Sequence, residues 1–195
     1  MELTQSQEDI LQAAIKVIAR KGYKGLTTNV LTKELKISEA ELAHHFGSID
    51  KLVETILEYF DDLSDLVMVE IENAELEPLE KIHRLVLDRY HLFNVQRDLT
   101  MVMLSTEIFY YDRIKDQRIS KIMGKHGKHI TSCLKEAQAQ GSVDPSCDPL
   151  QLFRIIVGST KFLVSQWNLS GQKFDLVAEG EKLFQTIRKL IEVPQ

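Results

Sequence analysis

The sequence predicts an all-α protein of about nine helices, and two observations support that fold class. Apolar residues recur three and four positions apart along most of the chain, which is the spacing of an amphipathic helix, whereas the alternation typical of strands is scarce. Proline, which interrupts helices, occurs only at positions 78, 145, 149 and 194. We therefore expect helices joined by short turns.

The first fifty residues predict three short helices. The first has its apolar face at residues 10–18 and is expected to stop at Gly22. Thr27 or Thr28 can cap the second helix, because a threonine side chain accepts a hydrogen bond from a backbone N–H group at a helix start. A tight turn is expected at residues 35–37.

The third helix is expected to begin at Ser38, and a fourth, longer helix at Ser48. Glu41 stands three residues after Ser38, which is the spacing of a capping box that would satisfy two backbone N–H groups. Two short helices joined by a tight turn form the outline of a helix-turn-helix, a common device for entering the major groove of DNA.

The rest of the chain predicts five longer helices. Their expected bounds are 78–93, 97–110, 115–141, 149–168 and 174–192. A turn rich in glycine, proline and serine separates the third of these from the fourth, and the pair Ser170-Gly171 separates the last two.

Composition and charge exclude several classes of protein. The chain contains no run of roughly 20 apolar residues that would span a membrane. Its N-terminal residues lack the basic-then-apolar order of a signal peptide, so a cytoplasmic protein is expected. The net charge of −5 argues against a protein that coats nucleic acid nonspecifically, but it leaves room for a small DNA-binding head on an acidic body.

Neither catalysis nor metal binding is expected. Cys133 and Cys147 lack the spacing of metal ligands, so two free thiols are the simpler interpretation and a redox switch is the alternative. His83, His91 and the acidic residues form no recognisable nucleophile or metal constellation. No cofactor is expected either.

Short motifs follow one another in register through the head. They are A-A-I-K-V-I-A-R-K-G-Y at 13–23, T-T at 27–28, L-T-K-E-L-K-I-S at 31–38, L-A-H-H-F at 42–46 and S-I-D-K-L at 48–52. This set resembles the DNA-binding head of TetR-family transcriptional regulators. The resemblance implies a helix-turn-helix head at residues 1–50. The residues expected to bind DNA are Thr27, Thr28, Lys33, Ser38, Glu39, Ala40, Glu41, Ala43, His44 and His45 in the head, and Lys51 directly after it.

The head departs from the family pattern where the chain turns and where it meets DNA. Lys36 stands where glycine is common, and a positive φ at a non-glycine residue costs roughly 1–2 kcal/mol. Ala43 and Ile49 stand where the family commonly carries a tyrosine and a lysine that hold the DNA backbone. Residues 1–50 carry six Lys and Arg against seven Asp and Glu, which leaves little charge for neutralising phosphates.

Two interpretations of the acidic residues on the third helix stay open. Glu39 and Glu41 stand where the family commonly has Lys or Arg and Thr or Ser, and either carboxylate can accept a hydrogen bond from cytosine N4. Alternatively, Glu41 is the capping partner of Ser38, and Glu39 is a solvated residue at a helix start, where negative charge is favoured.

Residues 118–184 combine a lysine-rich helix, a Gly-Ser turn, a helix ending in Trp167 and a Phe-Asp-Leu helix start. This order is similar to the bodies of the acyl-CoA-responsive TetR regulators of fatty-acid degradation, often called FadR. The resemblance implies that residues 51–195 bind an effector and dimerise. The expected ligand-binding residues are Met101, Met103, Leu104, Phe109, Tyr110, Arg113, Arg118, Lys121, Lys125, Phe153, Phe162 and Trp167.

Each group of body residues has a simpler alternative. Methionines and aromatic residues adapt to an apolar ligand, but they are also ordinary core residues. Arg118, Lys121, Lys125 and Lys128 share one helix face, which could receive the phosphates of CoA or simply be solvated. The last helix has more apolar residues than one exposed helix needs, so we expect a two-fold dimer interface at Leu183, Phe184, Ile187, Leu190 and Ile191.

Together these features predict a homodimeric repressor that binds a palindromic double-stranded DNA operator. A hydrophobic effector such as a fatty acid or acyl-CoA would release it, by binding one arrangement of the two heads better than the other. The alternative is a ligand-binding dimer whose degenerate head binds DNA weakly or not at all and acts through a protein partner. Neither membrane binding nor an enzymatic activity is expected.

Overall fold

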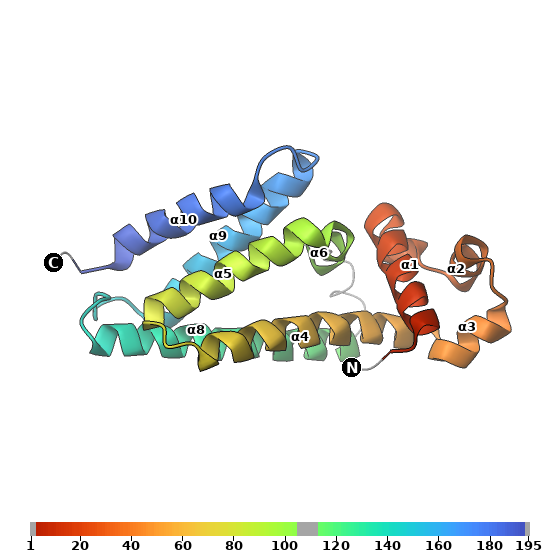
Figure 1. The fold of residues 1–195 in the computed structure, drawn as a ribbon, viewed down its shortest axis with the longest axis horizontal. Coiled ribbons are helices and arrows are strands. Elements are labelled where there is room, and N and C mark those ends of the chain that lie inside the picture. Colours follow the sequence, from red (N-terminus) through yellow and green to blue (C-terminus); the bar gives the residue numbers. More distant parts are fainter. Residues whose placement is uncertain (1–2, 105–112, 194–195) are drawn as a thin grey trace. The chain divides into compact units, whose positions relative to one another are not determined.

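The computed structural model describes residues 3–104 and 113–193, and for residues 104 and 113–119 it describes the backbone alone. In that part of the chain it contains nine α-helices and one short 3-10 helix (Figure 1). An isolated β-bridge joins Val143 to Glu192. The predicted all-α fold is therefore confirmed. Within the described residues, none of the helices combines the length and apolar character that a bilayer crossing requires.

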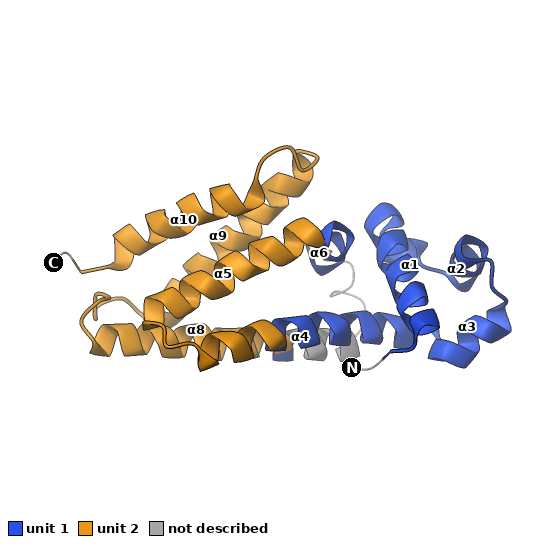
Figure 2. Ribbon diagram, in the orientation of Figure 1, with its two compact units in different colours: residues 1–65, 96–121 blue, residues 66–95, 122–195 orange. Residues whose placement is uncertain are grey.

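Two compact units make up the molecule (Figure 2). One comprises residues 1–65 and 96–121, and the other comprises residues 66–95 and 122–195. Helix α4 (Ile49–Asn73) runs without interruption through the expected domain boundary at residue 50. That boundary stays a prediction.

The first unit is built around α1 (Gln5–Lys21), whose buried face comprises Ile10, Leu11, Ala13, Ala14, Ile15, Val17 and Ile18. Thr4 and Gln7 form a capping box at its start, because the Gln7 N–H donates to Thr4 Oγ1 at 3.3 Å and the Thr4 N–H donates to Gln7 Oε1 at 3.0 Å. Helix α6 (Arg97–Leu104) packs against α1. The expected helix 97–110 is described only as far as Leu104.

The predicted three-helix head is confirmed in the same unit. The 3-10 helix η1 (Tyr23–Gly25) leads from α1 into α2 (Thr28–Leu35), and α3 (Glu39–Phe46) follows after a tight turn. Thr27 is the residue that caps α2, because its side chain accepts a hydrogen bond from the Val30 N–H at 3.3 Å. Buried Leu31, Leu42 and Phe46 fix the two helices against α1.

The second unit is a bundle formed by α5 (Pro78–Val95), α9 (Pro149–Leu169), α10 (Leu176–Ile191) and the C-terminal parts of α4 and α8 (Arg113–Ala139). Asp148 and Asp175 cap α9 and α10. Helix α10 packs against both α5 and α9. The approach to α5 is close, because a Cβ atom built on Gly180 would lie 2.2 Å from the ring of Tyr90.

Candidate functional site

The turn between α2 and α3 contains a residue with a left-handed backbone. Lys36 has φ 57° and ψ 40°. The next N–H group, that of Ile37, donates to the Thr32 carbonyl at 3.2 Å, which is the bond of a Schellman turn. The chain therefore holds a lysine in a conformation that favours glycine, at a cost of roughly 1–2 kcal/mol.

The start of α3 has half of the expected capping box. The Glu41 N–H donates to Ser38 Oγ at 3.1 Å, so Ser38 is the N-cap. The return bond, from the Ser38 N–H to the Glu41 carboxylate, is not formed in the described structure, whereas the complete box occurs at Thr4 and Gln7. The Glu41 carboxylate therefore remains available to other partners.

One face of α3 is buried and the opposite face is exposed. Leu42 and Phe46 point into the core of the head. Ala40 and His44 lie on the other side of the helix, because side chains turn by about 100° per residue. The exposed residues of α3 are Glu39, Ala40, Glu41, Ala43 and His44, whereas His45 is half-buried. These are residues that the sequence predicted to bind DNA.

Lysine side chains flank α3, but the helix itself contains neither lysine nor arginine. Residues 37–50 contain no lysine or arginine. Lys33 and Lys36 are exposed on α2 and on the turn, and Lys51 is exposed with its Nζ atom 3.0 Å from a Glu54 oxygen. Phosphate contacts by Lys or Arg would therefore have to come from outside α3.

Two histidines lie in the last turn of α3. The rings of His44 and His45 meet edge to face, with centroids 5.5 Å apart. The Gln7 side-chain amide donates to the His45 carbonyl at 3.4 Å, which fastens this end of α3 to α1. Of the remaining predicted DNA-binding residues, Thr27 is exposed and Thr28 is half-buried.

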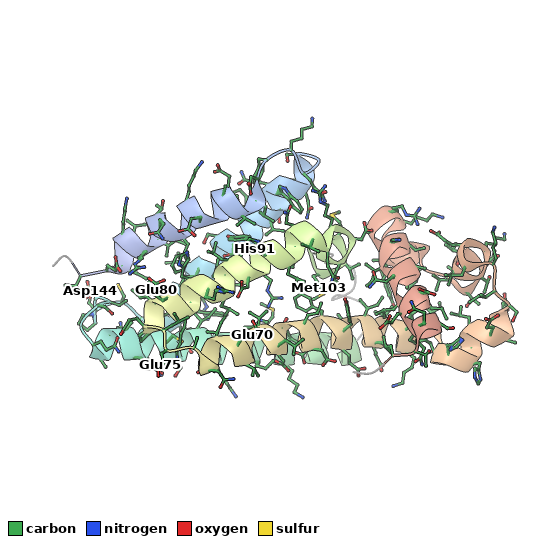
Figure 3. The ribbon with its side chains drawn as sticks, in the orientation of Figure 1. Glu70, Glu75, Glu80, His91, Met103 and Asp144 are labelled. Carbon is green, nitrogen blue, oxygen red and sulfur yellow. The ribbon has the colours of Figure 1, made fainter. Side chains whose placement is uncertain are left out.

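The predicted ligand-binding residues are spread over both units. Met101 is exposed and Met103 is half-buried on α6 of the first unit (Figure 3), and Lys121 also belongs to that unit. Phe109 and Tyr110 lie outside the described residues, as do the side chains of Leu104, Arg113 and Arg118. The ligand role of these residues stays a prediction.

The second unit holds the other predicted ligand residues in different surroundings. Trp167 is 1% exposed, and its Nε1–H donates to the Phe174 carbonyl at 3.0 Å, so it is a core residue of the bundle. Phe162 is 65% exposed, and Phe153 and Lys125 are half-buried. Trp167 thus has a structural role in this unit, whereas the other three side chains are accessible.

Arg89 is a body residue that the sequence did not indicate. It lies on α5, where burial lowers the pKa of its guanidinium to about 10. The guanidinium carbon lies 5.9 Å from the ring centroid of Phe93. A single charged residue within an amphipathic helix carries no signal by which sequence patterns would have revealed a binding role for Arg89.

The predicted dimerisation residues divide into buried and exposed ones. Phe184, Ile187 and Ile191 are buried within the bundle, and Leu183 is half-buried. Leu190, in contrast, is 79% exposed. Helix α9 adds three exposed apolar residues at intervals of seven, namely Ile155, Phe162 and Leu169. The exposed apolar residues of the second unit therefore include Phe162, which the sequence predicted to bind a ligand, and Ile155 and Leu169, which the sequence did not indicate.

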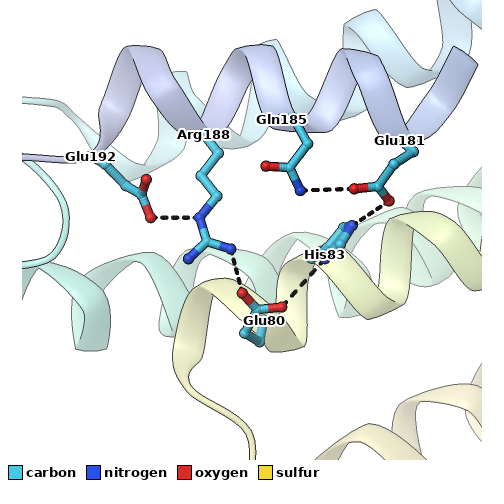
Figure 4. Close-up of polar contacts among 6 residues, drawn as sticks. All are labelled: Glu80, His83, Glu181, Gln185, Arg188 and Glu192. Carbon is cyan, nitrogen blue, oxygen red and sulfur yellow. Dashed lines mark hydrogen bonds and ion pairs between the residues drawn. The ribbon is translucent and has the colours of Figure 1, made fainter.

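A polar network joins α5 to α10 (Figure 4). The His83 ring lies between two carboxylates, with Nδ1 3.3 Å from a Glu80 oxygen and Nε2 2.7 Å from a Glu181 oxygen. Arg188 contacts Glu80 and lies 2.5 Å from Glu192. The hydrogen bond from Arg188 holds the pKa of Glu80 below its usual range. The ring of His83 also stacks on Phe184 at 4.7 Å, so charged and apolar contacts hold the same helix pair.

Sequence families match almost the whole chain in two consecutive parts. Residues 10–56 match the family described as bacterial regulatory proteins, tetR family. Residues 58–190 match the family described as YsiA-like protein, C-terminal region. The first part contains α2, α3 and the turn between them, and the second contains most of α4 and the remaining helices.

Known proteins are similar to this chain over nearly its full length. The nucleoid occlusion factor SlmA of Vibrio campbellii is 27% identical over 192 residues, which cover 97% of each chain. The ketosteroid transcriptional regulator KstR2 of Mycobacterium tuberculosis superposes with a TM-score of 0.86 at 18% identity, covering 99% of this chain and 98% of that one. FadR of Bacillus subtilis in complex with stearoyl-CoA superposes with a TM-score of 0.78 at 19% identity, covering 94% and 97%. At these identities the two superpositions establish the fold.

Proposed function

We propose, from the premise that this chain belongs to the TetR family of bacterial regulatory proteins and has a YsiA-like C-terminal region, that it is a homodimeric repressor released from its operator by an acyl effector. Membership of this family makes the chain a DNA-binding regulator rather than an enzyme. Repression, the dimer and the acyl effector are the proposal.

The surface of α3 is the observation that carries the proposal. A buried core at Leu31, Leu42 and Phe46 holds the helix in one position, while its opposite face is exposed. The αL turn at Lys36 sets the angle between α2 and α3. A rigid helix with one free face is the element that a helix-turn-helix inserts into the major groove.

A hydrophobic effector with an anionic group suits the body. Arg89 is a cation of the body whose guanidinium burial desolvates, and it is the residue that we propose to meet an anionic head group. The match to the YsiA-like region and the likeness to FadR, which was solved with stearoyl-CoA, favour a fatty acid or acyl-CoA. The likeness to KstR2, a ketosteroid regulator, supports a ring-based hydrophobic effector as the second class to test.

Exposed apolar residues on α9 and α10 support the proposed homodimer. Phe162, Leu169 and Leu190 are exposed large apolar residues, of the kind that protein interfaces bury. A two-fold dimer would bury them and supply two copies of α3 for a palindromic operator. Glutamate at both Phe162 and Leu190 should convert the dimer to a monomer in sedimentation experiments, and an unchanged dimer would place the interface elsewhere.

A band-shift titration tests the function directly. The probe is the DNA upstream of the chain's own gene, at low and at moderate salt, against a scrambled duplex. We expect a sequence-preferring complex that dissociates with oleoyl-CoA or oleate but not with free CoA. A complex that every compound leaves intact would contradict the acyl effector, and dissociation by a ketosteroid acid alone would favour the second effector class.

The role of Arg89 can be separated from a general effect of losing a cation. Arg89→Met should weaken the response to oleate about tenfold, because the carboxylate loses its cationic partner. Arg84→Met is the matched control, since Arg84 lies on the same helix, is exposed and pairs with Asp88 at 2.8 Å. Equal responses in the two variants would remove Arg89 from the effector site.

A second function is favoured by the charge of the head and by one relative. Residues 1–50 have a net charge of −1, from six basic and seven acidic residues. The similar protein from Vibrio campbellii is named a nucleoid occlusion factor rather than a transcriptional regulator. The alternative is a ligand-binding dimer whose weak head leaves it to act through a protein partner. The absence of a sequence-preferring complex even at low salt would favour this alternative.

A further inference from the structure

We propose that α3 reads its operator with a carboxylate and a methyl group instead of a cation. Glu41 accepts a hydrogen bond from the N4 amino group of a cytosine, and Ala40 packs against the methyl group of a thymine. This inference rests on the proposed DNA-binding function and adds the chemistry of the sequence that the protein prefers.

The exposed face of α3 lacks lysine and arginine. The commonest base-specific contact in protein–DNA complexes is a bidentate bond from Arg or Lys to guanine O6 and N7. Residues 37–50, which comprise α3 and the turns on both sides of it, contain no such side chain. Guanine therefore has no lysine or arginine partner on this helix, which favours other base edges as the source of specificity.

Glu41 lies beside the exposed face of α3. It directly follows Ala40 and precedes His44 by one helical turn, so its carboxylate flanks the stripe that points away from the core. Its backbone N–H is bonded to Ser38, but its carboxylate makes no hydrogen bond or ion pair with any described residue. Glu39 lies nearer the edge formed by buried Phe46, which makes it the poorer candidate for reading bases.

The major groove of DNA offers two hydrogen-bond donors to a carboxylate. Cytosine presents the N4 amino group there, and adenine presents the N6 amino group. In adenine the acceptor N7 lies beside N6 and repels a carboxylate, whereas guanine presents acceptors only. A carboxylate in the groove is therefore stabilised best by cytosine.

Placing a negative charge near the DNA phosphates costs free energy. Glu41 lowers the affinity for every duplex, because it repels the DNA backbone. Only a site with a donor opposite the carboxylate offsets that penalty, so Glu41 raises discrimination at the expense of affinity. Ala40 has the short side chain that lets α3 lie close to the base edges and contact a thymine methyl group.

Selection of preferred sites from a randomised duplex library tests the proposal, followed by band shifts with the wild type and Glu41→Gln. We expect the selected half-site to contain a cytosine that Glu41→Gln replaces by adenine, because glutamine pairs with adenine N6 and N7. The variant should also bind random DNA more tightly, while its preference for the wild-type site over random DNA falls about tenfold. The bond to Ser38 uses the Glu41 backbone, so the variant keeps its helix cap.

Matched controls separate base reading from a change in net charge. Glu75→Gln removes the same charge at an exposed residue between α4 and α5, and it should leave the preference unchanged (Figure 3). On the DNA side, deoxyuridine in place of the selected thymine removes only the methyl group, and it should weaken the wild type severalfold while affecting Ala40→Gly less.

The outcomes distinguish this inference from the proposed function. A selected site whose preference Glu41→Gln leaves unchanged would overturn the reading by Glu41 and leave the regulator intact. A site with no cytosine requirement would do the same. A library from which no preferred sequence emerges would overturn both proposals.

Discussion

The carboxylates on α3 are exposed to solvent, whereas those between α5 and α10 are bonded to neighbouring side chains. On α3, the carboxylates of Glu39 and Glu41 are exposed and bond to no described residue. Between α5 and α10, Glu80 and Glu181 each bond to a side chain of the facing helix (Figure 4). The same chemical group is a free acceptor in the first unit and a crosslink in the second.

This difference shows which acidic residues the fold needs. Removing a paired carboxylate takes one bond from its partner on the facing helix and destabilises the protein. Removing a free carboxylate changes only what the surface can bind. We therefore expect substitutions between α5 and α10 to change the free energy of unfolding, and substitutions on α3 to change DNA binding at nearly constant stability.

Gly180→Ala should have the largest effect, because it forces α10 away from α5. The added Cβ atom would lie 2.2 Å from Cε2 of the buried Tyr90 ring. We expect the free energy of unfolding, measured by urea denaturation, to fall by about 3 kcal/mol. Gly158→Ala is the control, since nothing lies within 4 Å of its added Cβ and alanine favours a helix by about 1 kcal/mol over glycine. Equal losses in both variants would contradict the close contact.

Arg188→Met tests the charged half of the same helix pair. The variant loses the contacts to Glu80 and Glu192, which should lower the free energy of unfolding by about 1 kcal/mol at neutral pH. Lys189→Met, at the exposed neighbouring position, should change it by less than about 0.5 kcal/mol.

The pH dependence of this loss has a definite sign. Arg188 lowers the pKa of Glu80, so the pairing stabilises the fold above the ordinary pKa of glutamate and is lost as the pH falls through the lowered value. The difference between the wild type and Arg188→Met, measured from pH 7 down to about pH 3, should therefore shrink below about pH 4. A difference that grows in acid would show that the pairing has been misassigned.

Lys36→Gly should have the opposite sign and a similar size. Glycine adopts the φ of 57° without strain, so thermal unfolding should report a gain of about 1 kcal/mol. Lys33→Gly removes the same charge from the exposed face of α2 and should lose about 1 kcal/mol. Because the two variants have the same net charge, any difference in their DNA binding reports on position.

The two thiols should differ in reactivity, and this prediction involves the smallest change in the free energy of unfolding. Burial raises the pKa of Cys133 to about 11, so its reactive thiolate is scarce at pH 8. A disulfide reagent should label only the half-buried Cys147 in the folded protein and label Cys133 on unfolding. Cys147→Ser should abolish the fast reaction, and rapid labelling of Cys133 in that variant would show that the bundle opens readily.

Local signals in the sequence were sufficient to predict the head. A threonine before an apolar run marked the start of α2, and Ser38 marked the start of α3. Lys36 stands where the family commonly has glycine, and its φ is 57°. These features depend on residues at most a few positions apart, which is why sequence patterns can specify them.

Contacts between distant residues could not be predicted in the same way. Periodicity showed that α10 has a broad apolar face, but not that its own bundle covers Phe184, Ile187 and Ile191. His83 and Glu181 are 98 residues apart, and no pattern links them. Spacing also suggested a capping box for Glu41, because it cannot tell whether a side chain turns towards its helix or away from it.

Trp167 makes the second unit observable without a label. It is the single tryptophan of the chain, it is almost fully buried, and its indole N–H bonds to the segment that connects α9 to α10. Its fluorescence is therefore expected at short wavelengths in the folded state and should shift to the red when that segment opens to water. An effector titration followed at this emission would report on the body alone, because the head contains no tryptophan.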